Sequence, residues 1–299
     1  MRARATLAAL LFVAAAALFG ADAAHAQGTA DGVTASQRYD LCLKFYKRRL
    51  YTKALETCNR VRNFHRDDPV SVLAELAIAD IYYQRGDREQ ARLAYEDFVR
   101  LHPRHKQVNY AIWRIGLCWW KTSPRWAGRD QTPTRQAVNV WTGYDARFPD
   151  SEYNDDVADL LLRARDRLAR KELVIARFYK GKDSRGGVRS WGAVEGRAET
   201  VIERYDDTPQ LPHALFLAAR AEHAWGDVSS ARLHRDQLAD VAPDSTWLAR
   251  IDRALAKPPG ERPADEVFLR PYKIPSVGSN MGMGAGAGAA MPGMGGPGM

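Results

Sequence analysis

The chain has 299 residues, of which 45% are hydrophobic and 27% are charged, and its formal net charge is +8 at pH 7. This length allows a sizeable hydrophobic core. The two signs of charge are interspersed, as on solvated helix faces, and no basic run is longer than Lys47-Arg48-Arg49. The charge pattern therefore argues against a nucleic-acid partner. It leaves open a basic patch that faces anionic lipid or an acidic partner.

Residues 1–26 have the three parts of a cleavable secretory signal peptide. Arg2 and Arg4 precede an apolar run from Leu7 to Phe19, which is followed by Ala24-His25-Ala26. The run is too short to span a membrane, and Ala-x-Ala is typical of a cleavage site. We expect cleavage after Ala26, export to the periplasm, and no lipid attachment, because no cysteine lies near the site. A retained anchor helix is the alternative, and residues 27–36 are expected to be a linker.

Residues 37–254 repeat one pattern five times. The clearest copy is Ala77–Pro103, in which Gly86 allows a left-handed turn between two helical runs and Pro103 ends the second. A small or β-branched residue near the start of each second helix is followed by larger apolar residues and a proline. These five residues are Ala54, Ala91, Ala137, Val194 and Ala231.

This order matches the tetratricopeptide repeat (TPR), a helical hairpin of roughly 34 residues. No alternating strand pattern of useful length is present. We therefore predict an all-α TPR superhelix of about five helical hairpins, with a globular helical bundle as the alternative. The wider repeat spacing predicts two insertions, one near residues 121–133, which is rich in proline, glycine and threonine, and one near residues 180–190, which contains three glycines.

Residues 255–299 change composition, first to a proline-containing stretch and then to a tail of glycine, alanine, methionine and proline. We expect disorder there, because such a segment buries too little apolar surface to offset its ordering entropy. Val267-Phe268-Leu269 could dock on the last repeat. Methionine thioethers can bind Cu(I), but the spacing is loose, so we predict no cofactor.

Three cysteines remain, at Cys42, Cys58 and Cys118. If Cys42 faces Ala54 across the first hairpin, Cys58 lies roughly 6 Å further along a helix about 8–10 Å away. A disulfide needs Cα atoms within about 7 Å. We therefore expect small buried thiols, and a Cys42–Cys58 disulfide is the alternative.

No residue pattern indicates catalysis. His102 and His105 form the only close histidine pair, and no cysteine or carboxylate cluster completes a metal site beside them. The sequence also lacks a zinc-protease motif, a nucleophile elbow and a phosphate-binding loop. We predict a binding protein that is not an enzyme.

The first helices of the repeats are expected to line the concave face. In repeat three, the stripe Tyr110, Trp113, Leu117 and Trp120 leaves Gly116 on the adjacent stripe, which should pack inside the protein. The same offsets extend the groove to Tyr39 and Tyr46 in repeat one and to Leu76, Asp80 and Tyr83 in repeat two. An aromatic groove suits an extended peptide, whereas the basic set of a carboxylate clamp is missing. In the alternative, the 121–133 insertion, with its own Trp126, buries Trp113 and Trp120.

Four stretches carry a family resemblance: His102–Tyr110, Arg129–Ala137, Tyr144–Tyr153 and Arg165–Tyr179. With their order and insertions, they resemble BamD, the TPR subunit of the machinery that assembles β-barrel proteins in the outer membrane. The resemblance covers about residues 37–245. The family is normally a lipoprotein, and the chain departs from it in lacking a lipidation cysteine.

The resemblance implies a periplasmic scaffold that binds the barrel-forming assembly subunit and unfolded outer-membrane protein segments, and it places Arg197 against that subunit. Association with the inner face of the outer membrane would come through these partners. The alternative is a soluble periplasmic TPR adaptor that coordinates cell-wall synthesis or envelope constriction. The sequence leaves open the oligomeric state and whether the groove is accessible.

Overall fold

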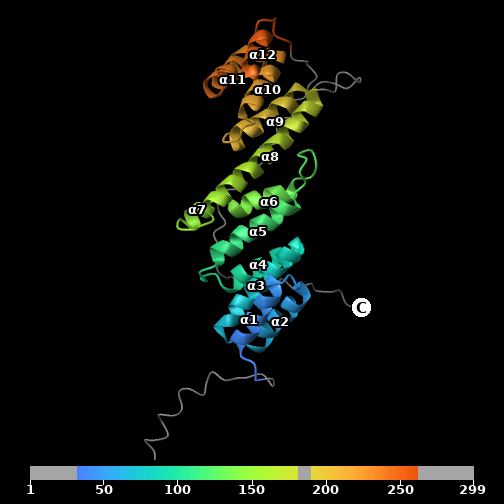
Figure 1. Cartoon of the computed structure of the whole chain (residues 1–299). Coiled ribbons are helices and arrows are strands. Elements are labelled where there is room, and N and C mark those ends of the chain that lie inside the picture. Colours follow the sequence, from blue (N-terminus) through green and yellow to red (C-terminus); the bar gives the residue numbers. More distant parts are fainter. Residues whose placement is uncertain (1–31, 181–189, 262–299) are drawn as a thin grey trace, which may run out of the picture.

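The computed structural model describes residues 32–180 and 190–261, and these ranges contain twelve α-helices and no strand. Figure 1 shows the helices stacked in chain order into an elongated array, with α1 and α2 at one end and α10 to α12 at the other. Within the described ranges, no helix combines the length and apolarity needed to cross a membrane. The predicted signal peptide, the Gly/Met-rich tail with Val267-Phe268-Leu269, and residues 181–189 lie outside the description.

Ten of the helices form five hairpins, which confirms the predicted all-α TPR fold. The pairs are α1 (Ala35–Lys47) with α2 (Tyr51–Phe64), α3 (Pro69–Arg85) with α4 (Arg88–Leu101), α5 (Val108–Thr122) with α6 (Thr132–Trp141), α8 (Asn154–Lys180) with α9 (Trp191–Arg204), and α10 (Leu211–Ala224) with α11 (Val228–Val241). The single turn α7 (Tyr144–Arg147) precedes α8. A further helix that the repeat pattern did not separate, α12 (Thr246–Leu255), packs on α10 and α11.

The predicted small residues lie where helices approach most closely. Ala54, Ala91, Ala137, Val194 and Ala231 have no exposed surface. A short side chain at a helix crossing lets two helix axes come within packing distance. The repeated small residue in the sequence therefore marks the helix contact within each repeat.

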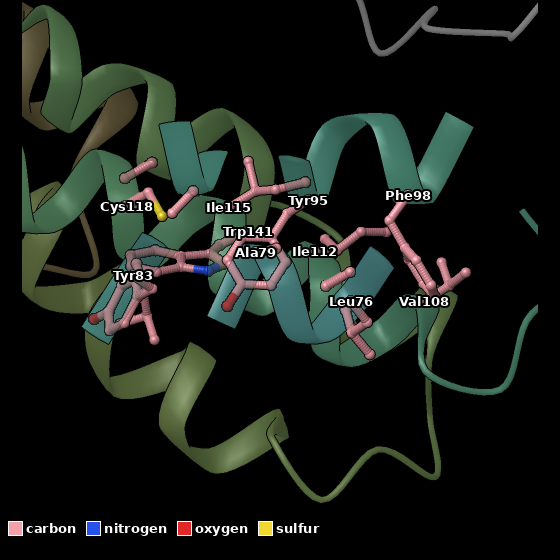
Figure 2. Packing of buried hydrophobic residues seen from close by; sticks show 14 of the residues in the cluster. Leu76, Ala79, Tyr83, Tyr95, Phe98, Val108, Ile112, Ile115, Cys118 and Trp141 are labelled. Carbon is pink, nitrogen blue, oxygen red and sulfur yellow. The ribbon is translucent and has the colours of Figure 1, made fainter. Parts of the chain in front are cut away.

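Gly116 shows the closest approach in repeat three. A Cβ atom built on Gly116 would lie 2.1 Å from Nε1 of Trp141, whose side chain is fully buried. Figure 2 shows Trp141 with Tyr95 and Ile115 in this core. The expectation that Gly116 faces into the protein is thus confirmed, because only glycine leaves room for the indole.

The ends of α3 follow local sequence signals. Asp68 caps the N-terminus, where its Oδ1 accepts a hydrogen bond of 2.9 Å from the backbone N–H of Val70, and Pro69 occupies the first turn. Gly86 ends the helix in the left-handed region, with φ = 103°. The turn predicted at Gly86 is therefore present.

The first hairpin contains a disulfide between Cys42 and Cys58, so the expectation of free thiols was wrong for these two residues. Their Cα atoms are 5.5 Å apart. The error lay in the assumed register: the turn is centred near Arg49, so Cys42 and Cys58 lie at similar heights on α1 and α2. Cys118 is a free, buried thiol, as expected, and burial raises its pKa to about 11.

Candidate protein-binding surfaces

An ion pair joins the first helices of repeats two and three. Nη2 of Arg114 on α5 lies 3.3 Å from Oδ1 of Asp80 on α3. The same oxygen accepts hydrogen bonds from the hydroxyls of Tyr95 and Tyr110, and Nε of Arg114 donates to the Tyr95 hydroxyl at 3.0 Å. Both charges therefore have partners, as a buried ion pair requires.

Aromatic rings surround the Arg114 guanidinium. Its carbon lies 3.8 Å from the ring centre of Tyr83, 5.4 Å from that of Tyr110 and 5.7 Å from that of Trp113. Such contacts are favourable cation–π interactions. The α3 and α5 parts of the predicted stripe thus converge on one buried cation.

The two predicted α1 residues face the same carboxylate. Burial, followed by the charge of Asp80, raises the pKa of both Tyr39 and Tyr46 above the ordinary tyrosine value. The phenols therefore stay protonated and can donate hydrogen bonds. We call Tyr39, Tyr46, Tyr83, Tyr110 and Trp113 the aromatic cluster, and it spans repeats one to three.

Not every residue predicted for the groove is accessible. Leu76 and Tyr83 are only 4% and 8% exposed, so their place in the peptide-binding set needs correction: they pack in the core and leave little surface for a partner. Trp113 is half-buried and stacks on Tyr153, with ring centres 4.5 Å apart. The accessible part of the aromatic cluster therefore comes chiefly from Tyr39, Tyr46 and Tyr110.

Trp120 belongs to a different site. Arg167 of α8 stacks on its ring at 3.8 Å, and Trp120 lines a cleft of about 610 Å³ between the α5–α6 loop, α8 and the start of α10. Trp126 of the loop stands at this cleft and is 64% exposed. The 121–133 insertion therefore borders Trp120, whereas Tyr153 covers Trp113, and the two tryptophans do not share one groove.

Arginine dominates the lining of this cleft, which we call the arginine cleft. Five arginines line it: Arg125, Arg163, Arg167, Arg170 and Arg177. Asp166 is the only acidic residue in the lining. Within the described ranges, the cleft thus presents an excess of positive charge.

Arg197 lies on α9 and is not among the residues that line the arginine cleft. Its Nη1 lies 2.8 Å from Oε2 of Glu172 on α8, and 43% of its side chain is exposed. The contact ties the two helices of repeat four, and the exposed remainder can still reach a partner.

One group of side chains has the composition of a metal site. The ligand atoms of Glu199, Glu222 and His234 lie within 4.8 Å of one another. Nδ1 of His234 is 2.9 Å from Oε2 of Glu222, and Nε2 is 3.8 Å from Oε1 of Glu199. Because His234 of α11 contacts both Glu199 of α9 and Glu222 of α10, we assign these groups to the packing of the last repeats.

Sequence reasoning missed the arginine cleft, although one signal for it was present. Arg163, Arg167, Arg170 and Arg177 recur at helical spacing along one face of α8. Interspersed with acidic residues, these arginines favour the interpretation of a solvated helix face. The second wall of the cleft comes from the α5–α6 loop, whose path the spacing did not predict.

Comparison with known proteins supports the family resemblance. Residues 31–238 match the sequence model of the family YfiO, described as outer membrane lipoprotein. Among solved structures, the TPR2AB-domain:pHSP90 complex of yeast Sti1 aligns with a TM-score of 0.40 at 16% identity, covering 74% of this chain and 84% of that chain. That similarity is too distant to add to the fold derived above.

Several curated relatives are named outer membrane protein assembly factor BamD. The relative from Neisseria meningitidis is 28% identical over 184 residues, or 58% of this chain and 67% of its own length. The relative from Caulobacter vibrioides is 28% identical over 214 residues, covering 71% and 68%. The family match includes most of the five hairpins and both candidate surfaces. Together with the similarity to the BamD relatives, it shows that the chain belongs to the YfiO family, described as outer membrane lipoprotein.

Proposed function

We propose that this protein is a non-catalytic scaffold in the assembly of outer-membrane β-barrel proteins. The family match over residues 31–238 carries the proposal. In support, the stacked hairpins present two separate surfaces of different chemistry, the aromatic cluster and the arginine cleft. The role assigned to the BamD relatives by name is thereby extended to this chain.

The aromatic cluster is proposed to receive extended, unfolded segments of outer-membrane proteins. Tyr39, Tyr46 and Tyr110 offer apolar ring faces, and the protonated hydroxyls of Tyr39 and Tyr46 can donate to the carbonyl groups of an extended backbone. The buried Arg114–Asp80 pair holds the Tyr110 ring in place through a hydrogen bond from its hydroxyl to Asp80 and a cation–π contact with Arg114. A preorganised surface of this type loses less side-chain entropy on binding.

Repeats three to five are proposed to hold the barrel-forming assembly subunit, with Arg197 at the contact. The exposed part of its guanidinium faces outward while Glu172 orients the side chain. Since Arg can donate several hydrogen bonds, it can bridge Glu172 and a carboxylate of a partner. Location in the cell envelope, through these partners, is part of the same proposal.

The test is site-specific photo-crosslinking in cells from positions 46 and 197, with partners identified by mass spectrometry. We expect unfolded outer-membrane protein segments from Tyr46 and the barrel-forming subunit from Arg197. Leu93 on α4 is the control position, because it is exposed on a second helix outside both surfaces. Capture of cell-wall synthesis proteins from both test positions would instead assign the chain to the periplasmic adaptor class.

A further inference from the structure

We propose that the arginine cleft binds an acidic peptide segment of a protein partner, with carboxylates at Arg125 and Arg177 and an apolar side chain against Trp126. This inference concerns a different surface from the aromatic cluster. It does not depend on what that cluster binds.

The unsatisfied charge lies at opposite walls of the cleft. Asp166 is already held by Arg170 at 2.8 Å and by the Gln210 amide at 2.9 Å. Within the described ranges, Arg125 and Arg177 make no ion pair or hydrogen bond, and both are exposed. Arg125 comes from the α5–α6 loop and Arg177 from α8, so a bound segment would contact both walls.

The electrostatic field inside the cleft is positive at both ends. Burial and the charges of Arg125 and Arg170 lower the pKa of Arg167. At the other end, burial and the charges of Arg177, Lys180 and Arg250 lower the pKa of His213 to about 4. Arg167, despite the opposing charge of Asp166, and His213 thus both respond to nearby cations, whose repulsion an acidic ligand would relieve.

Trp126 is exposed but held in place. A Cβ atom on Gly128 would lie 2.2 Å from the indole, so the ring lies directly over this glycine. The fully buried Gln131 donates its amide to the carbonyl oxygens of Trp126, at 2.9 Å, and Pro124, at 3.4 Å. A guanidinium of Arg167 also donates to Pro124 at 3.3 Å. The loop therefore presents a fixed aromatic face beside the arginines.

These features favour a peptide over a membrane surface. The site is a cleft of about 610 Å³, within the range of sites that enclose a small ligand or a few side chains, about 300–1,000 Å³. Arginine pairs with carboxylates through two parallel hydrogen bonds, and an indole face packs on apolar side chains. A segment that alternates acidic and aromatic residues matches both.

The experiment measures binding of two synthetic hexapeptides to the purified full chain by fluorescence anisotropy. One has the sequence Glu-Asp-Phe-Glu-Asp-Phe, and the other replaces each acid by its amide. We expect binding of the acidic peptide only. We also expect at least tenfold weaker binding in the double variant Arg125→Glu/Arg177→Glu, since each reversed charge removes a charge-assisted contact.

The matched control is Arg232→Glu/Arg253→Glu, which changes the net charge equally at exposed positions on α11 and α12. It should bind like the wild type. Equal weakening in both double variants would overturn the proposal, because only overall charge would then matter. The cleft would be assigned to a membrane if the protein bound anionic phosphatidylglycerol vesicles but not the peptide, and if vesicle binding required Arg125 and Arg177. A dimer lost in the Arg125→Glu/Arg177→Glu variant would assign it to a second copy of the chain.

Discussion

Asp80 and Arg114 are separated by 34 residues, yet they form the ion pair that joins repeats two and three, with 3.3 Å between Oδ1 and Nη2. Their side chains are only 22% and 9% exposed. The pair lies behind the accessible rings of the aromatic cluster. This TPR array thus contains a largely buried ion pair beside its aromatic cluster.

Removal of one partner from this pair should be costly. We expect Asp80→Asn to lower the free energy of unfolding by about 3 kcal/mol, because the Arg114 charge would stay buried with a weaker acceptor. Urea unfolding followed by circular dichroism measures the effect. The control is Asp159→Asn, which breaks the exposed pair with Arg163 and should cost below about 1 kcal/mol. Equal losses in the two variants would contradict the structural role of the buried pair.

A methyl group at Gly116 should disturb the core of repeat three. The added Cβ would meet the buried Trp141 indole at 2.1 Å, and overpacking of this kind costs about 1–3 kcal/mol. Gly116→Ala should therefore lower the thermal midpoint. When Trp141 is first replaced by Phe, Gly116→Ala should lower the thermal midpoint less, because the smaller ring leaves room for the added methyl group. If Gly116→Ala costs the same in both backgrounds, Trp141 is not the obstacle.

The repeats were predictable because their signals are local and recur. Small residues such as Ala91 and Ala137 mark helix contacts, and Gly86 marks a turn that needs a positive φ. The register of the first hairpin gave no such signal. Its turn contains Arg49 at φ = 58°, a residue type that rarely marks a left-handed position.

The candidate sites were only partly predictable, because helical spacing identifies one face and not what covers it. The stripe correctly grouped Tyr110 and Trp113, but it could not show that Tyr153 stacks on Trp113. Likewise, the arginines of α8 were visible in the sequence. Their cleft depends on a loop that is ordered by the buried amide of Gln131, and this long-range arrangement has no periodic signature.

The disulfide should stabilise the first hairpin. Cys42 and Cys58 are 16 residues apart, and a loop of about 15 residues corresponds to about 3 kcal/mol of stabilisation in the chain-entropy view. Cys42→Ser/Cys58→Ser should therefore unfold at lower urea concentration than the oxidised wild type. Alkylation under native conditions followed by mass spectrometry should leave Cys118 unmodified, because its thiol is buried and its pKa is about 11. Native labelling of Cys42 or Cys58 would contradict the bridge.

The cluster of Glu195, Glu199 and His234 should contribute less to stability as the pH rises. Burial and the charges of Glu222 and Glu199 raise the pKa of Glu195 from 4.5 to about 7, and burial raises that of Glu199. Burial lowers the pKa of His234, but its hydrogen bond with Glu222 and the nearby carboxylates raise it overall. Each of these groups holds its proton more tightly in the folded state, so its contribution is complete at low pH and is lost as the pH passes the folded pKa.

The contribution of Glu195 to the free energy of unfolding should change between about pH 4.5 and about pH 7, which are the ordinary and the folded values of its pKa. Relative to the wild type, Glu195→Gln should therefore raise the urea midpoint more at pH 8 than at pH 5, because the amide does not titrate and does not become a buried charge. Glu89→Gln on α4 is the control, since Glu89 is exposed and distant in the repeat array, and it should retain the wild-type pH dependence. If Glu195→Gln unfolds with the same pH dependence as the wild type, Glu195 does not titrate in this window, and the carboxylate cluster does not couple pH to the stability of these repeats.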